Sequence, residues 1–138
     1  MTQANSAWNA AEEGRRGDEA LSAARHLLQG GFANDAISRA YYAAFHWARA
    51  LLVSKGIEPK THRGVIQLLG LHFVKNGRLS YKVSAMLAHL ETYRELSDYT
   101  SASQFTEEQA QAEVARAAQF VAKCRALLKG PKRPGKRP

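Results

Sequence analysis

The sequence has one cysteine, one proline outside its last eight residues and no long apolar run, and each scarcity excludes a class of protein. Cys124 alone cannot close a disulfide within the chain, which excludes a disulfide-stapled secreted domain and favours a reducing compartment. No stretch approaches the roughly 18 apolar residues of a membrane span. The N-terminus also lacks the basic start and apolar run of a signal peptide. We therefore expect a cytoplasmic protein that does not contact a membrane.

The composition is that of one globular domain with an uneven charge. The chain has 138 residues, of which 45% are apolar and 23% charged, enough to bury a core. Its net charge is +8, and the basic side chains gather in residues 36–90 and in the last ten residues, 129–138. A basic middle indicates a polyanionic partner, either nucleic acid or an acidic protein. The alternative is a solvated basic surface with a solubilising tail.

The apolar periodicity predicts helices and no strands. Because Pro59 is the one internal proline, long stretches can be helical without interruption. Apolar residues recur at intervals of three and four. This spacing predicts helices over residues 18–29, 35–55, 61–75, 80–99 and 107–128. An alternative start of the first helix lies near Trp8, and the third helix is expected to be loosened at Gly70. Expected helix caps are Asn34 or Asp35, Thr61, and the capping box formed by Thr106 and Gln109.

These elements predict an all-α fold, an up-and-down antiparallel bundle of four to five helices. We assign the bundle to residues 18–128, an N-terminal extension or start of the first helix to residues 1–17, and a basic disordered tail to residues 129–138. Alanines recur along the second helix, which permits close helix approach either within a monomer or between two copies. They are Ala36, Ala40, Ala43, Ala44, Ala48 and Ala50.

No motif in the sequence predicts a metal ion or a cofactor. The five histidines form no Cys/His cluster, and neither Gly-x-Gly-x-x-Gly nor a phosphate loop is present. Cys124 lies on the apolar stripe of the last helix and is expected in the core. The chemistry must therefore come from other side chains.

Two groups of polar residues could bind a ligand. Arg39, Tyr42, His46 and Arg49 are spaced by three, four and three residues, which places them along one helix face. Such a row suits phosphate and base contacts, but it is equally the pattern of a solvated or subunit-contact face.

The second group is Arg94, Asp98 and Tyr99, near the end of the fourth predicted helix. Arg94 and Asp98 are four residues apart and can pair. One interpretation is a surface ion pair, worth under about 1 kcal/mol. The other is an arginine held by a carboxylate beside a tyrosine, in position to bind a phosphate.

At this point the sequence resembles a known family, the HEPN domain, a helical nucleotide-binding domain of higher eukaryotes and prokaryotes. The resemblance covers about residues 18–128. It is carried by the run Ala-Ile-Ser-Arg-Ala-Tyr-Tyr-Ala-Ala-Phe at 36–45, Ala-Arg-Ala-Leu-Leu at 48–52, Thr-His-Arg-Gly at 61–64, Phe-Val-Lys-Asn-Gly at 73–77, and Arg94 with Asp98 and Tyr99.

The resemblance implies a helical bundle that forms homodimers and pairs with a minimal nucleotidyltransferase, as toxin and antitoxin. Active members of the family are metal-independent ribonucleases whose arginine is followed by a histidine four to six residues later. The two motifs of a dimer face one cleft. In one branch, the nucleotidyltransferase adds AMP to a tyrosine near this motif, and here Tyr99 would be the acceptor.

This chain departs from the family motif at its histidine. Arg94 matches the family arginine, but Tyr99 stands where the histidine would be. At pH 7 a tyrosine of ordinary pKa is ionised at about one part in a thousand, which makes it a poor proton acceptor. A ribonuclease would need Arg94 with a histidine from elsewhere, such as His46 or His62.

The sequence therefore predicts a toxin-like HEPN subunit that binds RNA or a nucleotide in a dimer cleft. The alternatives are a non-catalytic module for protein interaction or nucleotide binding, and a ribonuclease with Arg94 and Tyr99 as its candidate catalytic residues. The expected phosphate or nucleotide ligands are Arg39, Tyr42, His46, Arg49, Arg94, Asp98 and Tyr99.

Overall fold

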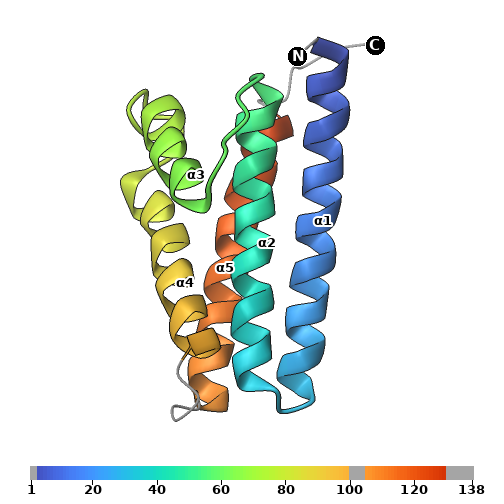
Figure 1. Cartoon of the computed structure of the whole chain (residues 1–138), viewed down its shortest axis with the longest axis vertical. Coiled ribbons are helices and arrows are strands. Elements are labelled where there is room, and N and C mark those ends of the chain that lie inside the picture. Colours follow the sequence, from blue (N-terminus) through green and yellow to red (C-terminus); the bar gives the residue numbers. More distant parts are fainter. Residues whose placement is uncertain (1–2, 100–104, 130–138) are drawn as a thin grey trace.

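The computed structural model describes residues 3–99 and 105–129, and these residues form helices but no strand (Figure 1). The helices are α1 (Gln3–Gln29), α2 (Ala33–Ser54), α3 (His62–Leu69), α4 (Tyr81–Tyr99) and α5 (Glu107–Lys129). Among them α1, α2, α4 and α5 run alternately down and up, and α3 lies at the upper end beside α2 and α4 (Figure 1). The predicted all-α, up-and-down antiparallel bundle is confirmed.

The expected basic tail lies outside the described residues, apart from Lys129, as does the polar segment at 100–104. In the part of the chain that the structure describes, no helix is long and apolar enough to cross a membrane. No group of three or more histidine, cysteine, aspartate or glutamate side chains there could hold a metal ion.

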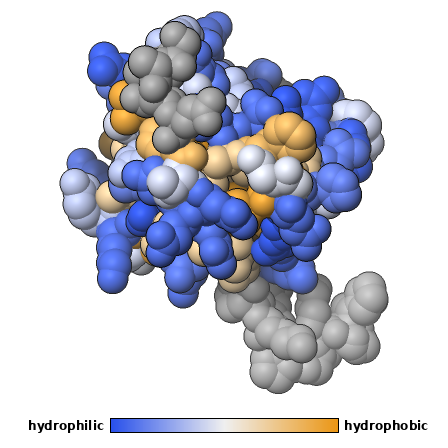
Figure 2. Space-filling view, turned by 90° about the horizontal axis from the view of Figure 1, so that it is seen from below, coloured by the Kyte–Doolittle hydropathy of each residue, from blue (hydrophilic) through white to orange (hydrophobic). Residues whose placement is uncertain are grey.

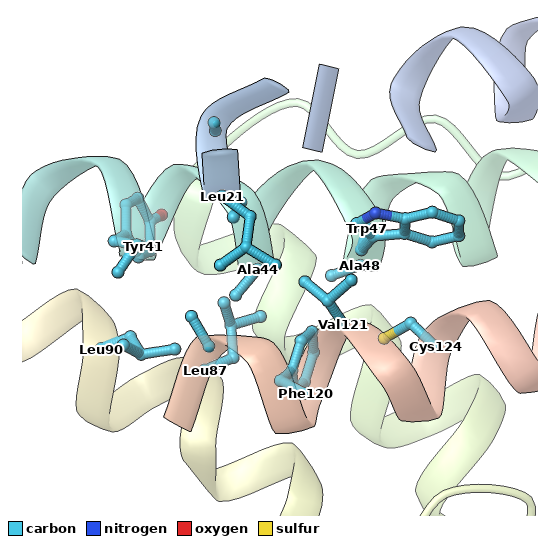
Figure 3. Packing of buried hydrophobic residues seen from close by; sticks show 14 of the residues in the cluster. Leu21, Tyr41, Ala44, Trp47, Ala48, Leu87, Leu90, Phe120, Val121 and Cys124 are labelled. Atoms are coloured by element: carbon cyan, nitrogen blue, oxygen red, sulfur yellow. The ribbon is translucent and has the colours of Figure 1, made fainter. Parts of the chain in front are cut away.

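Helix α2 is the central element of the bundle because it contacts each of the other four helices. Its buried side chains lie between Leu21 of α1, Leu87 and Leu90 of α4, and several residues of α5 (Figure 3). The alanines of α2 singled out above are all fully buried within the monomer. Their small side chains therefore serve close packing inside one chain, and they give no support for a second copy.

The turn between α1 and α2 is set by glycine. Gly31 has φ of 86°, a left-handed conformation that glycine adopts without steric cost. Its amide donates to the Leu28 carbonyl, and the Phe32 amide donates to the Leu27 carbonyl, which together form a Schellman motif. This ending of α1 leads directly into α2.

The predicted helix caps are partly correct. The Thr61 hydroxyl accepts from the Gly64 amide at 2.8 Å. Thr106 and Gln109 exchange hydrogen bonds of 2.9 and 3.1 Å as a capping box. The expected cap of α2 at Asn34 or Asp35 is wrong, because α2 begins at Ala33 with Phe32 as an N-cap that provides no side-chain hydrogen bond.

Two helices differ in detail from the sequence pattern. Helix α1 begins at Gln3, well before residue 18 and also before Trp8. After α3, a π-helical turn at Gly70–Val74 closes with a hydrogen bond from the Lys75 amide to the Gly70 carbonyl. Gly70 does loosen this helix, as the sequence indicated, by widening one turn rather than by ending it.

The core occupies the interior of the bundle, between α2 and its neighbours (Figure 3). Cys124 is fully buried there, and burial raises the pKa of its thiol, so it is a packing residue rather than a nucleophile. The largest fully buried side chains are Tyr41, Phe73, Phe120, Ile37, Leu51, Leu52, Leu69, Leu87 and Leu90.

Candidate functional site

Arg94 projects from α4 onto the aromatic side chains of α2. Its guanidinium carbon lies 5.1 Å from the ring centroid of Tyr41 and 6.0 Å from that of Tyr42, distances typical of cation–π contact. The side chain is only 12% exposed. The ion pair expected from the spacing is present, with Asp98 at the surface (37% exposed) and the arginine largely enclosed by tertiary packing.

Arg94 remains charged and keeps part of its hydrogen-bonding capacity. Its Nη1 donates to Oδ2 of Asp98 at 3.3 Å, while its Nε is buried without a hydrogen-bond partner in the described chain. Burial by itself lowers the pKa of Arg94. The hydrogen bond to Asp98 and the charges of Asp98 and the two tyrosines have the larger effect, so the pKa is raised. The guanidinium is therefore a fixed cation whose donors are not all used within the described chain, and such a group suits an anionic ligand at its accessible edge.

Hydrogen bonds to α2 hold the end of α4 in place. Ser38 donates to Oδ1 of Asp98 at 2.7 Å. Asn34 donates to the Ser97 carbonyl at 3.2 Å and accepts from the Phe105 amide at 3.0 Å. Asn34 thus joins α2 to both sides of the α4–α5 connection instead of capping its own helix, and Asp98 is fixed for its contact with Arg94.

His62, the first residue of α3, reaches the same site from another element. Its Nδ1 lies 2.8 Å from the Tyr41 hydroxyl, and its ring centroid lies 4.3 Å from that of Phe45. Burial, followed by the charge of Arg94, lowers the pKa of His62, so its ring is neutral at pH 7. Burial, followed by the charge of Glu91, raises the pKa of Tyr41, so the phenol stays protonated. We call Tyr41, Tyr42, His62, Arg94 and Asp98 the Arg94 site.

The lowered pKa of His62 predicts a dependence of stability on pH. Below the ordinary histidine pKa of about 6.5, the unfolded chain takes up a proton at this residue that the folded chain resists. We therefore expect the free energy of unfolding to fall as pH drops from 7 towards 5. Thermal unfolding of the wild type and of His62→Gln should show a smaller acid loss in the variant. Equal losses would contradict the placement of His62.

The predicted row of polar residues along α2, from Arg39 to Arg49, divides into two parts. Arg39, Tyr42 and His46 line a cavity of about 580 Å³ between α1 and α2, together with Arg16 and Glu19 of α1. We call this the α1–α2 cavity; its remaining lining residues are Ala20 and Ala23. Arg49 does not line it. The Nε of Arg49 donates to Oε2 of Glu13 at 2.9 Å, and its Nη1 donates to the Pro59 carbonyl at 3.3 Å.

Glu13 connects Arg49 to the histidine of the same row. Its Oε1 lies 2.7 Å from Nδ1 of His46. Although burial raises the pKa of Glu13, hydrogen bonds from His46 and Arg49 outweigh it, so that the pKa is lowered and the carboxylate is ionised. An ionised carboxylate can only accept, so Nδ1 of His46 carries the proton of this contact.

Tyr99 does not join the Arg94 site. It is the last residue of α4, it is 80% exposed, and the described chain gives it no hydrogen bond or ring contact with Arg94. Five residues along a helix turn a side chain by about 140° from the first, which accounts for this separation. Tyr99 is accessible to another protein but does not take the place of the missing histidine.

Sequence patterns missed two members of this region. Tyr41 is a core residue that also links Arg94 to His62, and Glu13, which no sequence motif singles out, orients His46. The adjacent Tyr41-Tyr42 pair carried the one available signal, because neighbouring residues on a helix point about 100° apart. One ring can then face the core while the next faces a groove.

Comparison with known proteins identifies the architecture. The HEPN domain model matches residues 11–127, which include every residue of the Arg94 site and of the α1–α2 cavity. The chain belongs to the HEPN domain family. Arg94 lies within the matched residues, on α4 and five residues before its last residue, Tyr99.

Several proteins are similar to this HEPN chain. "Putative toxin MJ0605" of Methanocaldococcus jannaschii is 39% identical over 112 residues, covering 81% of this chain and 83% of that protein. A "UPF0332 protein" of Thermotoga maritima is 30% identical, with coverages of 86% and 90%. The crystal structure of TT1696 from Thermus thermophilus superposes with a TM-score of 0.73 at 18% identity, covering 85% of this chain and 96% of that one. This last likeness shows the shared fold alone.

Proposed function

We propose that this HEPN protein is the toxin-like subunit of a toxin–antitoxin pair and that it binds RNA phosphates at the Arg94 site. One observation carries the proposal: the guanidinium of Arg94 lies against the rings of Tyr41 and Tyr42, and within the described chain only its Nη1 has a hydrogen-bond partner, Asp98. Arginine held in this way suits a phosphate, because the guanidinium remains charged and presents directed N–H donors. The name of the Methanocaldococcus relative supports a toxin role.

RNA binding and RNA cleavage are separated by one experiment. A fluorescein-labelled single-stranded RNA is titrated with the protein in EDTA, and the RNA is then resolved on a denaturing gel. Binding that weakens with salt and leaves the RNA intact supports a binding module, because phosphate contacts release counterions. Absence of binding at low salt contradicts the proposal.

A metal-independent ribonuclease is the second candidate, favoured by the two histidines that approach from other elements. His62 contacts Tyr41, and His46 lies along α2 beside Tyr42, with each tyrosine also in contact with Arg94. In this reaction a histidine takes the proton of a ribose 2′-hydroxyl, the 2′-oxygen bonds to phosphorus, and the 5′-oxygen leaves and takes up a proton. Cleaved RNA in the EDTA experiment would favour this candidate over simple binding.

We further propose a minimal nucleotidyltransferase as the partner and Tyr99 as its AMP acceptor. The exposure of the Tyr99 side chain supports this role, since its hydroxyl is open to a second protein. In the reaction the Tyr99 oxygen bonds to the α-phosphorus of ATP, pyrophosphate leaves, and the phenolic proton passes to water. Incubation with a minimal nucleotidyltransferase that co-purifies with this protein, and with ATP, should add the mass of AMP to the wild type but not to Tyr99→Phe. An equal mass gain in both proteins would exclude Tyr99.

The proposed assembly is a homodimer in which two such sites share a cleft. Figure 2 shows apolar surface between hydrophilic side chains at the end of the bundle where α1 turns into α2. Phe32, in this turn, and Leu96, in the last turns of α4, are 58% and 46% exposed. Burial of these side chains by a second copy would stabilise a dimer. A single monomer mass in sedimentation at micromolar concentration would contradict it.

A further inference from the structure

The α1–α2 cavity carries positive charge that no ion pair in the described chain neutralises. Arg16 and Arg39 form no hydrogen bond or salt bridge with any residue of the described ranges, and the guanidinium of Arg39 lies 5.8 Å from the Tyr42 ring. By contrast, the neighbouring Arg15 and Arg49 are paired with carboxylates. The two free guanidinium groups face the same cavity from different helices, as required for contact with one anion.

The carboxylates near this cavity already have hydrogen-bond partners. Glu19 lines it but accepts from Arg15 at 2.9 Å, and Glu13 is held by His46 and Arg49. Their negative charges are therefore compensated by partners other than Arg16 and Arg39. The charge available to a ligand in the cavity is positive.

His46 adds a hydrogen-bond acceptor to the wall of the cavity. Because its Nδ1 donates to the ionised Glu13, the unprotonated nitrogen of a neutral ring is Nε2. This nitrogen accepts hydrogen bonds and belongs to a side chain that lines the cavity. Phosphate oxygens offer no proton to it, whereas a hydroxyl group does. The two arginines and His46 together therefore select a ligand that carries a hydroxyl group near its phosphate.

The cavity adjoins the Arg94 site through a shared side chain. Tyr42 lines the cavity, and its ring contacts both Arg39 and Arg94, at 5.8 and 6.0 Å. His46 comes seven residues after Arg39, which is about 10 Å along α2 and longer than one nucleotide step. A strand bound at Arg94 can therefore continue past Tyr42 into the cavity.

We propose that the α1–α2 cavity is a second RNA subsite, in which Arg16 and Arg39 bind a phosphate and Nε2 of His46 accepts a hydrogen bond from a ribose 2′-hydroxyl. This inference rests on the proposed RNA binding at Arg94 and extends it along the same strand. It gives the protein a means of distinguishing RNA from DNA, because the 2′-hydroxyl is the group that DNA lacks. Glu13 acts as a positioning residue by orienting the imidazole.

The test compares RNA and DNA strands of identical sequence. Fluorescence anisotropy is measured at pH 8 with unstructured 12-nucleotide single strands and the full-length protein. Arg16→Ala and Arg39→Ala should each weaken binding of both strands by about tenfold and lower the salt slope by about one. His46→Phe should weaken RNA binding by about fivefold and leave DNA binding unchanged, which also shows that the variant is folded.

Arg25→Ala is the matched control. Arg25 is also on α1 and exposed, but it comes nine positions after Arg16, which places it about 180° away around the helix. We expect it to bind both strands as the wild type does. If Arg16→Ala and Arg39→Ala match Arg25→Ala while Arg94→Ala abolishes binding, the cavity subsite is overturned and the proposed function stands.

Two further outcomes separate the remaining possibilities. If Arg94→Ala leaves RNA binding unchanged and the cavity variants weaken it, the proposed Arg94 function fails while the phosphate contacts of the cavity hold. If the wild type binds RNA and DNA equally, or His46→Phe weakens both strands alike, recognition of the 2′-hydroxyl by His46 is overturned.

Discussion

Replacing Arg94 with alanine is expected to weaken the binding of single-stranded RNA by at least about tenfold. The change removes a charged donor group whose contacts with phosphate contribute about 1.5–3 kcal/mol each. Arg94→Lys should recover part of the affinity, since lysine retains the positive charge but lacks the planar fork that fits between Tyr41 and Asp98. Titration of labelled RNA by fluorescence anisotropy measures both variants.

Arg125→Ala is the matched control for this prediction. Arg125 also pairs with a carboxylate, Asp18, and lies 4.7 Å from an aromatic ring, that of Trp47, but it belongs to α5 and lies outside both the Arg94 site and the α1–α2 cavity. Both alanine variants should lose some thermal stability, and only Arg94→Ala should lose RNA binding. Equal RNA affinity of the two folded variants would contradict a phosphate role for Arg94.

Replacing Gly17 with alanine is expected to destabilise the protein by about 1–3 kcal/mol, although alanine is the better helix former. A Cβ at Gly17 would lie 2.4 Å from Cδ1 of Trp47 and 3.1 Å from the Ala43 carbonyl oxygen. Trp47 cannot move away easily, because it is buried and its Nε1 donates to Asp18 at 3.0 Å. The glycine in the middle of α1 thus permits the close approach of α2.

Denaturant unfolding of the wild type and two glycine variants measures this effect. Gly70→Ala is the control of opposite sign, because Gly70 has ordinary right-handed helical dihedrals and a Cβ there meets nothing within 4 Å. It should be neutral or stabilising by up to about 1 kcal/mol. Were Gly17→Ala as stable as the wild type, the packing of Trp47 against α1 would have to differ from that described.

Most of the fold could be predicted from the sequence because helices form by local rules. The apolar spacing places Cys124 in the core, where it is fully buried. Thr61 and the pair Thr106 and Gln109 cap their helices as expected. Asn34 failed as a cap because its amide has partners elsewhere in the fold, at Ser97 and Phe105, that no local rule takes into account.

The candidate site was predicted less completely. The sequence singled out Arg94 as well as Arg39, Tyr42 and His46, but it also included Tyr99, which lies apart from Arg94, and Arg49, which Glu13 and Pro59 engage. A row on one helix face shows which side chains can lie together. It does not show which of them a carboxylate from another helix will neutralise.

The sequence by itself determined the helices, their order, the apolar faces that bury against one another and the resemblance to the HEPN family, because each depends on spacing along the chain. Only the tertiary structure decided that Arg94 is enclosed, that His62 approaches it across Tyr41, and that Arg16 and Arg39 are left unpaired beside an oriented His46. The physical reason is that charge pairing and burial depend on distances between side chains from different helices, and these distances exist only once the helices are packed.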